Sequence, residues 1–157
     1  MKNMIKIKKL SPDAIIPSIG NSMDACFDLY ALEDTEFSPF EIKLVKTGIS
    51  IELPENFRSN IYVRSSTPLK KGFMLANSVG IIDNGYRGEL MIQLLNISNI
   101  LNGNGEVYFK KNKISRGDKI AQLEIVQAIP AGSFEFKIVS ELSQTERGEG
   151  GFGSTGR

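Results

Sequence analysis

Hydrophobic and polar residues alternate in several short stretches of the chain. The alternation covers residues 5–7, 42–44, 49–53 and 134–138, and glycine, proline or asparagine bounds these stretches. Successive side chains of a strand point to opposite faces, so a period of two predicts half-buried β-strands.

Denser apolar runs predict further strands that are more deeply buried. They cover residues 61–63, 73–75, 90–95, 107–109 and 120–126. Helical periodicity does not extend beyond about two turns anywhere in the chain. We therefore expect an all-β sandwich or barrel built from short strands.

One short helix is expected in this β framework. Thr67 is a suitable N-cap, Pro68 fits the first helical position, and Gly72 is a suitable terminator after Lys70 and Lys71. Proline near the start and glycine after the end of a helix are typical of helix boundaries.

Residues 77–89 carry the local signal of a tight turn. Apolar residues precede and follow an Asn84-Gly85 pair, which predicts a β-hairpin with a two-residue loop. Asp83 and Tyr86 would lie together at its tip. The chain has no histidine, so a carboxylate such as Asp83 is the natural candidate for a general base. Alternatively, Asp83 only bonds its own turn, as many aspartates before Asn-Gly do.

Composition narrows the functional classes. The chain has 157 residues, enough for one domain, and its formal net charge is only +1. This balance does not suggest a protein that coats nucleic acid or an anionic membrane. A single cysteine, Cys26, and no histidine argue against a disulfide framework and a thiolate or imidazole zinc site. No secretory signal or membrane span is visible, so we expect a reducing, cytoplasmic location.

Two further segments can carry chemistry. Arg64, Ser65 and Ser66 end a predicted strand and enter the short helix, which suggests an anion site. Helix capping with a surface arginine is the structural alternative. Residues 147–157 contain five glycines and almost no apolar side chain, so they form either a disordered tail or a flexible lid. Gln122 is a polar residue in an apolar strand, and such an amide is often structural.

Taken together and in order, five segments resemble the motifs of the trimeric all-β dUTP pyrophosphatases. The segments are residues 24–31, 64–72, 80–88, 116–122 and 147–156. Cys26 replaces a small glycine that is usual in the first motif, and Pro68 is unusual in the second. Neither change removes a functional group.

The resemblance implies a jelly-roll-like β domain of residues 1–146, one short helix, and a flexible glycine-rich C-terminal lid of residues 147–157. It also implies a homotrimer with shared active sites that hydrolyses dUTP to dUMP and pyrophosphate with Mg²⁺. Such an enzyme limits uracil incorporation into DNA and supplies dUMP for thymidylate synthesis. Neither a nucleic acid nor a membrane is expected as a partner.

The resemblance also assigns roles to individual residues. Asp83 would deprotonate the water that attacks the α-phosphorus, and Tyr86 would lie against the deoxyribose. Asp28 would orient magnesium through water. The remaining assignments are Arg64, Ser65, Ser66 and Gln122 to the phosphates or the water, Asn77 and Gly80 to the uracil edge, and Arg147, Phe152, Gly153, Ser154 and Thr155 to a cover over the substrate.

Two alternatives remain at this stage. A dCTP deaminase has a similar fold but uses a glutamate in the strand after the turn, where this chain has Gln93. An amide cannot shuttle the protons that deamination needs. A non-catalytic nucleotide-binding regulatory module is the second alternative, although such a module would have little need of Asp83.

Overall fold

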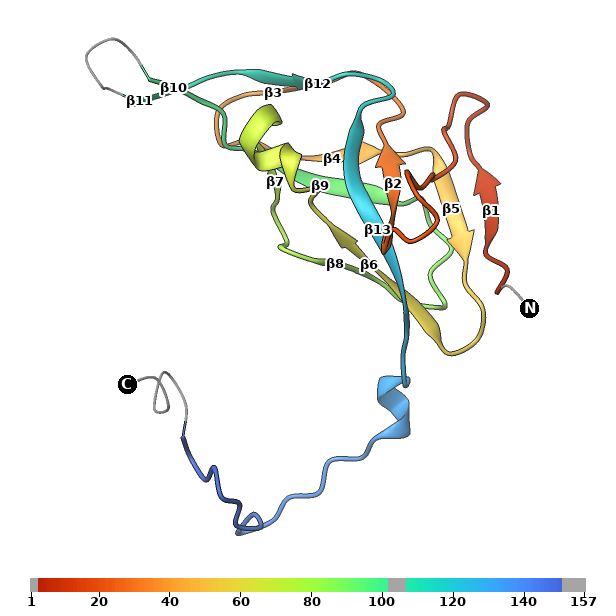
Figure 1. Cartoon of the computed structure of the whole chain (residues 1–157), viewed down its shortest axis with the longest axis vertical. Helices are drawn as coiled ribbons and strands as arrows, with labels where there is room; N and C mark the ends of the chain where they lie inside the picture. The colour runs from red at the N-terminus through yellow and green to blue at the C-terminus, as the bar shows by residue number, and fades with distance from the viewer. Residues whose placement is uncertain (1–2, 102–106, 151–157) are drawn as a thin grey trace.

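The computed structural model describes residues 3–101 and 107–150 (Figure 1). Short strands dominate this part of the chain, as the sequence predicted. The strands are β1 (Lys6–Lys9), β2 (Cys26–Tyr30), β3 (Thr35–Phe37), β4 (Ile42–Lys46), β5 (Ile49–Glu52), β6 (Phe57–Tyr62), β7 (Phe73–Leu75), β8 (Gly80–Ile82), β9 (Met91–Asn96), β10 (Asn99–Leu101), β11 (Val107–Phe109), β12 (Asn112–Ile114) and β13 (Lys119–Gln127).

Two larger antiparallel sheets organise the domain. One has the strand order β2-β13-β6-β8 and the other the order β4-β9-β7. Three two-stranded pairs, β1-β5, β3-β12 and β10-β11, complete the framework. Most neighbours in the two larger sheets are distant in sequence, so the fold depends on long-range pairing.

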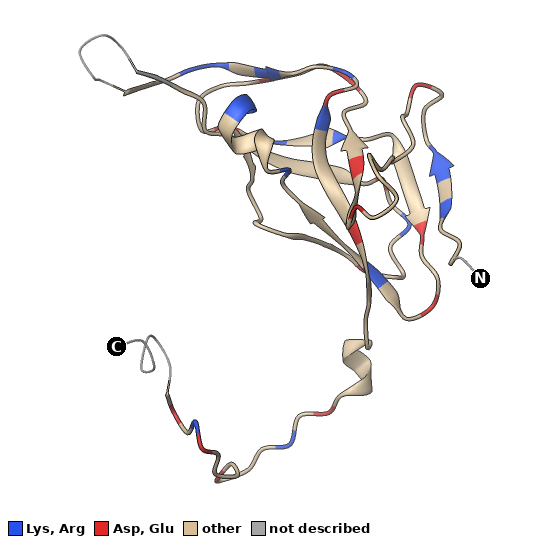
Figure 2. Cartoon of the chain, viewed as in Figure 1, with Lys and Arg blue, Asp and Glu red and all other residues tan. Residues whose placement is uncertain are grey.

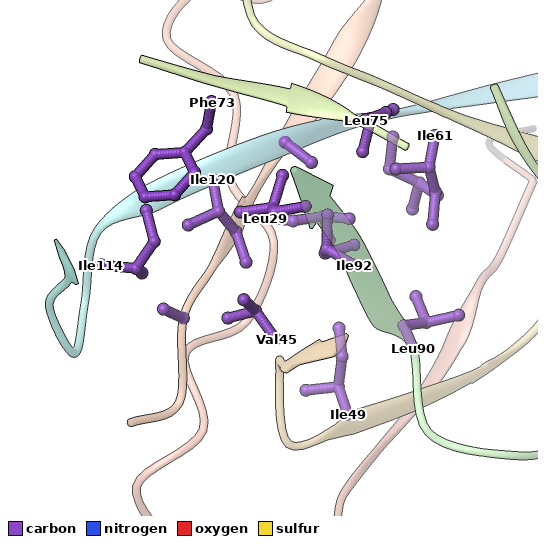
Figure 3. Packing of buried hydrophobic residues seen from close by; sticks show 14 of the residues in the cluster. Leu29, Val45, Ile49, Ile61, Phe73, Leu75, Leu90, Ile92, Ile114 and Ile120 are labelled. Carbon is purple, nitrogen blue, oxygen red and sulfur yellow. The ribbon is translucent and has the colours of Figure 1, made fainter. Parts of the chain in front are cut away.

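One hydrophobic core joins the two larger sheets (Figure 3). Leu29 and Ile61 enter it from the four-stranded sheet, and Ile92 and Phe73 enter it from the three-stranded sheet. The Phe73 ring meets Phe37 edge to face, with ring centroids 4.8 Å apart. Burial of these apolar side chains is the main stabilising term of such a fold.

The expected hairpin at residues 77–89 is wrong. β8 pairs with β6, whereas β9 pairs with β4 and β7. The turn itself is present, because the Tyr86 N–H donates to the Asp83 carbonyl at 3.0 Å. The predicted turn at Asn84-Gly85 is therefore confirmed, but it connects strands of two different sheets.

The short helix is a single π-type turn, η1 (Thr67–Lys71). Its N-cap is Ser66 rather than the expected Thr67, and Gly72 closes it by donating its N–H to the Thr67 carbonyl. Gly72 has φ 67°, and a Cβ there would lie 2.2 Å from Ser98 Oγ. Both the backbone conformation and the close packing therefore require glycine.

Two expectations about burial are also wrong. Ile42 and Leu44 are exposed, whereas the next residue, Val45, is fully buried. β11 is a strand, as expected, but its residues are exposed rather than buried. The apolar pattern located these strands without identifying the face that meets the core.

The last described segment leaves the domain as an extended arm (Figure 1). A short 3₁₀ turn, η2 (Ala131–Ser133), follows β13, and residues 134–149 are exposed. The strand expected at residues 134–138 does not form, and the Phe136 side chain is fully exposed. The division of the chain at residue 146 stays a prediction. Within the described ranges, no helix is long and apolar enough to span a membrane.

Candidate active site

A cavity of about 450 Å³ lies on the outer side of the four-stranded sheet, and we name it the Arg64 pocket. It collects residues from β2, from β13, from the loop before β2 and from the segment after β6. Its lining residues are Gly20, Asp24, Ala25, Cys26, Asp28, Arg64, Ser65, Lys119 and Gln122. Three of the five sequence motifs therefore meet within one chain.

Sheet register explains why these motifs meet. On β13, Gln122 lies opposite Asp28 of β2 on one side and Tyr62 of β6 on the other. Residues directly opposite each other in a sheet share a face. The Gln122 amide also donates to the Val63 carbonyl at 3.2 Å, which ties β13 to the segment that carries Arg64.

Asp28 is the centre of an ion-pair network. Its Oδ1 lies 2.7 Å from Arg64 Nε, and its Oδ2 lies 2.7 Å from Lys119 Nζ. The Asp28 side chain is only 15% exposed. The hydrogen bond to Asp28 and its negative charge raise the pKa of Lys119 above its ordinary value. Asp28 therefore pairs with both cations of the pocket, and the basic start of β13 lies beside the acidic position of β2 (Figure 2). The lining also includes the Asp24 carboxylate.

The loop before β2 forms one wall of the Arg64 pocket. The Asp24 carboxylate accepts hydrogen bonds from the backbone N–H groups of Gly20, at 3.1 Å, and Asn21, at 2.8 Å. Asp24 therefore shapes the loop. Cys26 also lines the cavity, and burial, followed by the charges of Glu124 and Asp28, raises the pKa of its thiol. A raised pKa keeps the thiol neutral and disfavours a nucleophilic role.

Of the two serines after Arg64, only Ser65 belongs to the pocket lining. Ser65 lines the pocket and is exposed, and Ser66 is half-buried. Ser66 is the N-cap of η1, but its side chain makes no capping hydrogen bond. The structural alternative for Ser66, helix capping through its hydroxyl, is therefore not what the molecule uses.

Asp83 occupies a different surface. Its turn is anchored because the Asn84 amide donates to the carbonyls of Pro54, at 2.7 Å, and Phe57, at 2.9 Å. The Asp83 carboxylate is exposed, and within residues 3–101 and 107–150 no hydrogen bond or ion pair engages it. The Asx bond considered as an alternative is thus absent from this described part of the chain.

The residues expected to read the nucleoside lie along the same segment. A Cβ at Gly80 would lie 3.7 Å from Asn77 Nδ2 and 3.2 Å from the Ile61 Cβ. The absence of a side chain at Gly80 therefore leaves the space beside the Asn77 amide open. The Tyr86 hydroxyl donates to the Glu89 carbonyl at 3.0 Å. The Tyr86 ring lies so close to Gly88 that a Cβ there would be 2.5 Å from its Cζ.

One chain does not bring Asp83 to the Arg64 pocket. Ile82 pairs with Ser59, so Asp83 lies level with Arg58, and about six residues of extended chain separate that level from Arg64, roughly 20 Å. A second cavity of about 470 Å³ borders Asp83. It shares no lining residue with the Arg64 pocket.

The arm is the third part of the expected site. Arg147 is exposed, and its Nε donates to the Gly150 carbonyl at 3.0 Å. The other expected arm residues, Phe152, Gly153, Ser154 and Thr155, lie outside the described residues.

The metal-binding capacity of the site is small. Across the described part of the chain, no three His, Cys, Asp or Glu residues cluster as metal ligands. Both oxygens of Asp28 are already ion-paired, so Asp28 is not prepared for direct coordination. This donor set fits a hydrated magnesium ion held mainly by substrate phosphates.

Sequence reasoning missed Lys119 as a site residue. A detectable signal was present, because Ile120 and Ala121 are consecutive apolar residues that interrupt a regular alternation. Such an interruption in a strand is typical of a bulge, which turns a neighbouring side chain to the other face.

The Arg64 pocket thus offers a guanidinium, an ammonium group, a hydroxyl and an amide to an anionic ligand, and Asp83 presents an unpaired carboxylate on a separate turn of the described chain. The family model described as dUTPase matches residues 12–156. The chain therefore belongs to the dUTPase family, whose members hydrolyse dUTP, and the family resemblance of its five motifs is confirmed.

Individual relatives agree with this assignment. The chain is 45% identical over 152 residues to a deoxyuridine 5'-triphosphate nucleotidohydrolase of Clostridioides difficile, and the alignment covers 97% of each chain. It is 42% identical to the protein of that name from Clostridium tetani, over 98% of this chain and 97% of the other. A dUTPase variant of Staphylococcus bacteriophage 80alpha, solved with dUpNHpp, is 29% identical with a TM-score of 0.82, covering 99% and 100% of the two chains.

Proposed function

We propose that the protein hydrolyses dUTP to dUMP and pyrophosphate at sites assembled from several copies of the chain. The Arg64 pocket of one copy would hold the phosphates, and Asp83 of another copy would deprotonate the attacking water. The separation of Asp83 from the Arg64 pocket within one chain carries this proposal.

The chemistry needs positioning and one base. Arg64, Ser65, Ser66 and Gln122 would hold the phosphates or the water near the α-phosphorus, where a guanidinium stabilises developing negative charge. Asp83 accepts the proton from that water. A positioned general base contributes about 10²–10⁴-fold to the rate. The bond from the α-phosphorus to its bridging oxygen breaks, and pyrophosphate leaves.

Selection of the nucleoside would come from the segment around Asp83. Asn77 and the backbone near Gly80 would pair with the uracil edge, and Tyr86 would exclude a 2′-hydroxyl. Arg147, Phe152, Gly153, Ser154 and Thr155 would cover the base and contact the outer phosphates. Closure of such a cover excludes water and strengthens the electrostatic interactions inside the site.

Magnesium is the proposed cofactor. A dUTPase of phage phi11, 28% identical with a TM-score of 0.75 over 90% of this chain and all of that one, was described with a structural Mg(II) ion. In this chain Asp28 would orient the ion through water, and when bound, the ion would neutralise phosphate charge. Besides the ion, the positive charges at this site come from the side chains of Arg64 and Lys119.

An apolar sheet face supports a homotrimer. The outer face of the β4-β9-β7 sheet carries Ile42, Leu44, Met74 and Met91, which are 39–57% exposed. Apolar clusters of this kind mark association surfaces. Coverage by other copies would remove the face from water and bring each Asp83 toward a neighbouring pocket.

The arm supports the same assembly. Phe134, Phe136 and Ile138 are 65%, 101% and 99% exposed, although their alternation with polar residues is typical of a half-buried strand. An arm of this composition gains stability when it packs on another surface, because its apolar side chains leave water. We propose that another copy supplies that surface, and that the trimer acts in the cytoplasm.

Mixing two inactive variants tests the shared site. Asp83→Asn removes the base and Arg64→Gln removes the phosphate ligand, so each homotrimer should lose about 10²-fold or more in kcat. In randomly mixed trimers, a site with both groups intact forms when an Asp83→Asn chain supplies the pocket and an Arg64→Gln chain supplies the base. The chain that supplies the pocket is Asp83→Asn with probability one half, and the chain that supplies the base is Arg64→Gln with probability one half. Activity should therefore return to about one quarter of wild type.

The controls separate assembly from chemistry. Each variant mixed with itself must stay inactive, and light scattering must give trimers for both. Activity in the mixture no higher than the average of the two variants would show that pocket and base belong to the same chain. Wild-type activity of the Asp83→Asn homotrimer would remove Asp83 as the base.

A further inference from the structure

A β-bulge places Lys119 beside the site. Gln122 faces Asp28 and Ala121 faces Leu29, but Lys119 pairs with Tyr30 because the register shifts between Lys119 and Ala121. Ile120 and Ala121 are therefore both fully buried, and Lys119 is half-buried. In a regular strand, residues 119 and 121 would share the inward face. The bulge instead turns Lys119 to the outer face that carries Gln122.

Two contacts hold Lys119 there. Its Nζ lies 2.7 Å from Asp28 Oδ2 and 5.9 Å from the centroid of the Tyr30 ring. The Tyr30 hydroxyl lies 2.6 Å from Ser18 Oγ, and the Asp28 N–H donates to the Ser18 carbonyl at 2.7 Å. The ammonium group thus meets a carboxylate and a ring that are themselves fixed to one loop.

Asp28 and a bound phosphate would both attract the Arg64 guanidinium. Asp28 binds Arg64 through Nε, so the terminal nitrogens of the guanidinium remain available to a phosphate. A carboxylate facing Arg64 alone would offset the positive charge that a phosphate needs. Lys119 pairs with the second Asp28 oxygen and so offsets the charge of this carboxylate. Asp24 is the other carboxylate of the pocket lining, and its oxygen accepts from two backbone N–H groups of its own loop instead.

We propose that Lys119 is a positioning residue for phosphate binding, which acts through Asp28 to keep Arg64 oriented and its charge available. Lys119 would not need to touch the substrate itself. This inference rests on the proposed role of the Arg64 pocket and adds a residue to it.

Binding measured without magnesium isolates this effect. Calorimetric titration in EDTA would compare dUpNHpp, which carries phosphates, with deoxyuridine, which has none. Lys119→Gln should weaken dUpNHpp binding about tenfold and leave deoxyuridine binding unchanged. Lys119→Arg keeps the charge, so it should stay within about threefold of wild type.

A double variant separates positioning from simple structural support. In Asp28→Asn/Lys119→Gln, no carboxylate opposes Arg64, so dUpNHpp should bind at least threefold tighter than to Lys119→Gln alone. Lys113→Gln is the matched control, because Lys113 forms a 2.6 Å ion pair with Asp34 outside the pocket. It should bind both ligands as wild type does.

Three results would overturn the inference. They are wild-type affinity of Lys119→Gln for dUpNHpp, an equal loss for deoxyuridine, and no recovery in the double variant. A separate measurement tests whether the Arg64 pocket is the phosphate site at all. If the Arg64→Gln variant bound dUpNHpp as wild type does, the Arg64 pocket would not be the phosphate site, and the role of Lys119 would fall with it.

Discussion

The Arg64 pocket and the Asp83 turn differ in how completely one chain builds them. In the Arg64 pocket, Asp28 is ion-paired to two cations, and the Gln122 amide donates to the Val63 carbonyl just after β6. At the turn, Asn84 fixes the backbone, but the Asp83 carboxylate is exposed and unpaired within the described ranges. The side chains of the pocket are therefore held by contacts within one chain, whereas the turn has a fixed backbone and a carboxylate without a partner in the described ranges.

This difference shows which steps depend on assembly. The groups that we propose for phosphate binding take their positions from sheet register in a single chain. Proton transfer needs a carboxylate within hydrogen-bond reach of the water. Asp83 lies roughly 20 Å from the pocket in its own chain, so as the proposed base it would act across a subunit boundary. Association would therefore control catalysis more strongly than it controls ligand binding.

The largest expected effect comes from breaking the apolar sheet face. Leu44→Glu places a charge on the surface that we propose other copies cover, and burial of an unpaired carboxylate is strongly unfavourable. Light scattering should give monomers at micromolar concentration, and kcat/KM for dUTP should fall more than about 10²-fold because no pocket meets an Asp83. Binding of dUpNHpp should fall less than turnover does.

Met4→Glu is the control for this variant, because Met4 is also apolar and is 77% exposed but lies outside the sheet face. It should remain trimeric and active. A Leu44→Glu protein that stays trimeric would exclude this face as the interface, and an active monomer would refute the shared site.

Removal of residues 147–157 should have the next largest effect. Among the removed residues that the structure describes, Arg147 to Glu149 are exposed and Gly150 is half-buried, so Tm should change little. Hydrolysis should fall about 10–10²-fold, because the deletion removes Arg147, Phe152 and two hydroxyls from the proposed cover. Thermal unfolding and steady-state kinetics measure the two quantities.

Trypsin gives an independent test of the same segment. Arg147 is exposed, so trypsin should cut there in the free protein, and dUpNHpp with magnesium should slow the cut. Equal cleavage with and without the analogue, together with full activity of the shortened protein, would show that the segment is no lid.

The sequence predicted local structure better than it predicted partners. The ranges expected for β7 and β11 agree with the structure, because short apolar runs between turn residues leave few alternatives. The Asn84-Gly85 turn was also recognised. Its flanking strands were assigned to each other because that pairing is local, but β8 and β9 find partners that are distant in sequence.

The error at β4 has a different physical cause. Both faces of this strand are apolar in part, so alternation alone cannot separate a core face from a face that other copies would cover. Leu44 satisfies the pattern of a buried residue and yet is 57% exposed in one chain. The Lys119 network was missed for a third reason. The apolar pair Ile120-Ala121 indicates a bulge, but only the register of β2 and β13 shows that Lys119 comes to lie beside Asp28.

The smallest expected effect concerns selectivity at the Asp83 turn. Tyr86→Ala removes a ring that we propose excludes a 2′-hydroxyl, so the ratio of kcat/KM for UTP to that for dUTP should rise about tenfold. The Tyr86 hydroxyl bonds the Glu89 carbonyl of its own loop, so Tyr86→Phe serves as the control that keeps the ring. If the ring excludes the hydroxyl by its volume, Tyr86→Phe should keep the wild-type ratio. A similar rise in both variants would instead assign selectivity to the loop conformation that this hydrogen bond maintains, and an unchanged ratio in both would remove Tyr86 from sugar recognition.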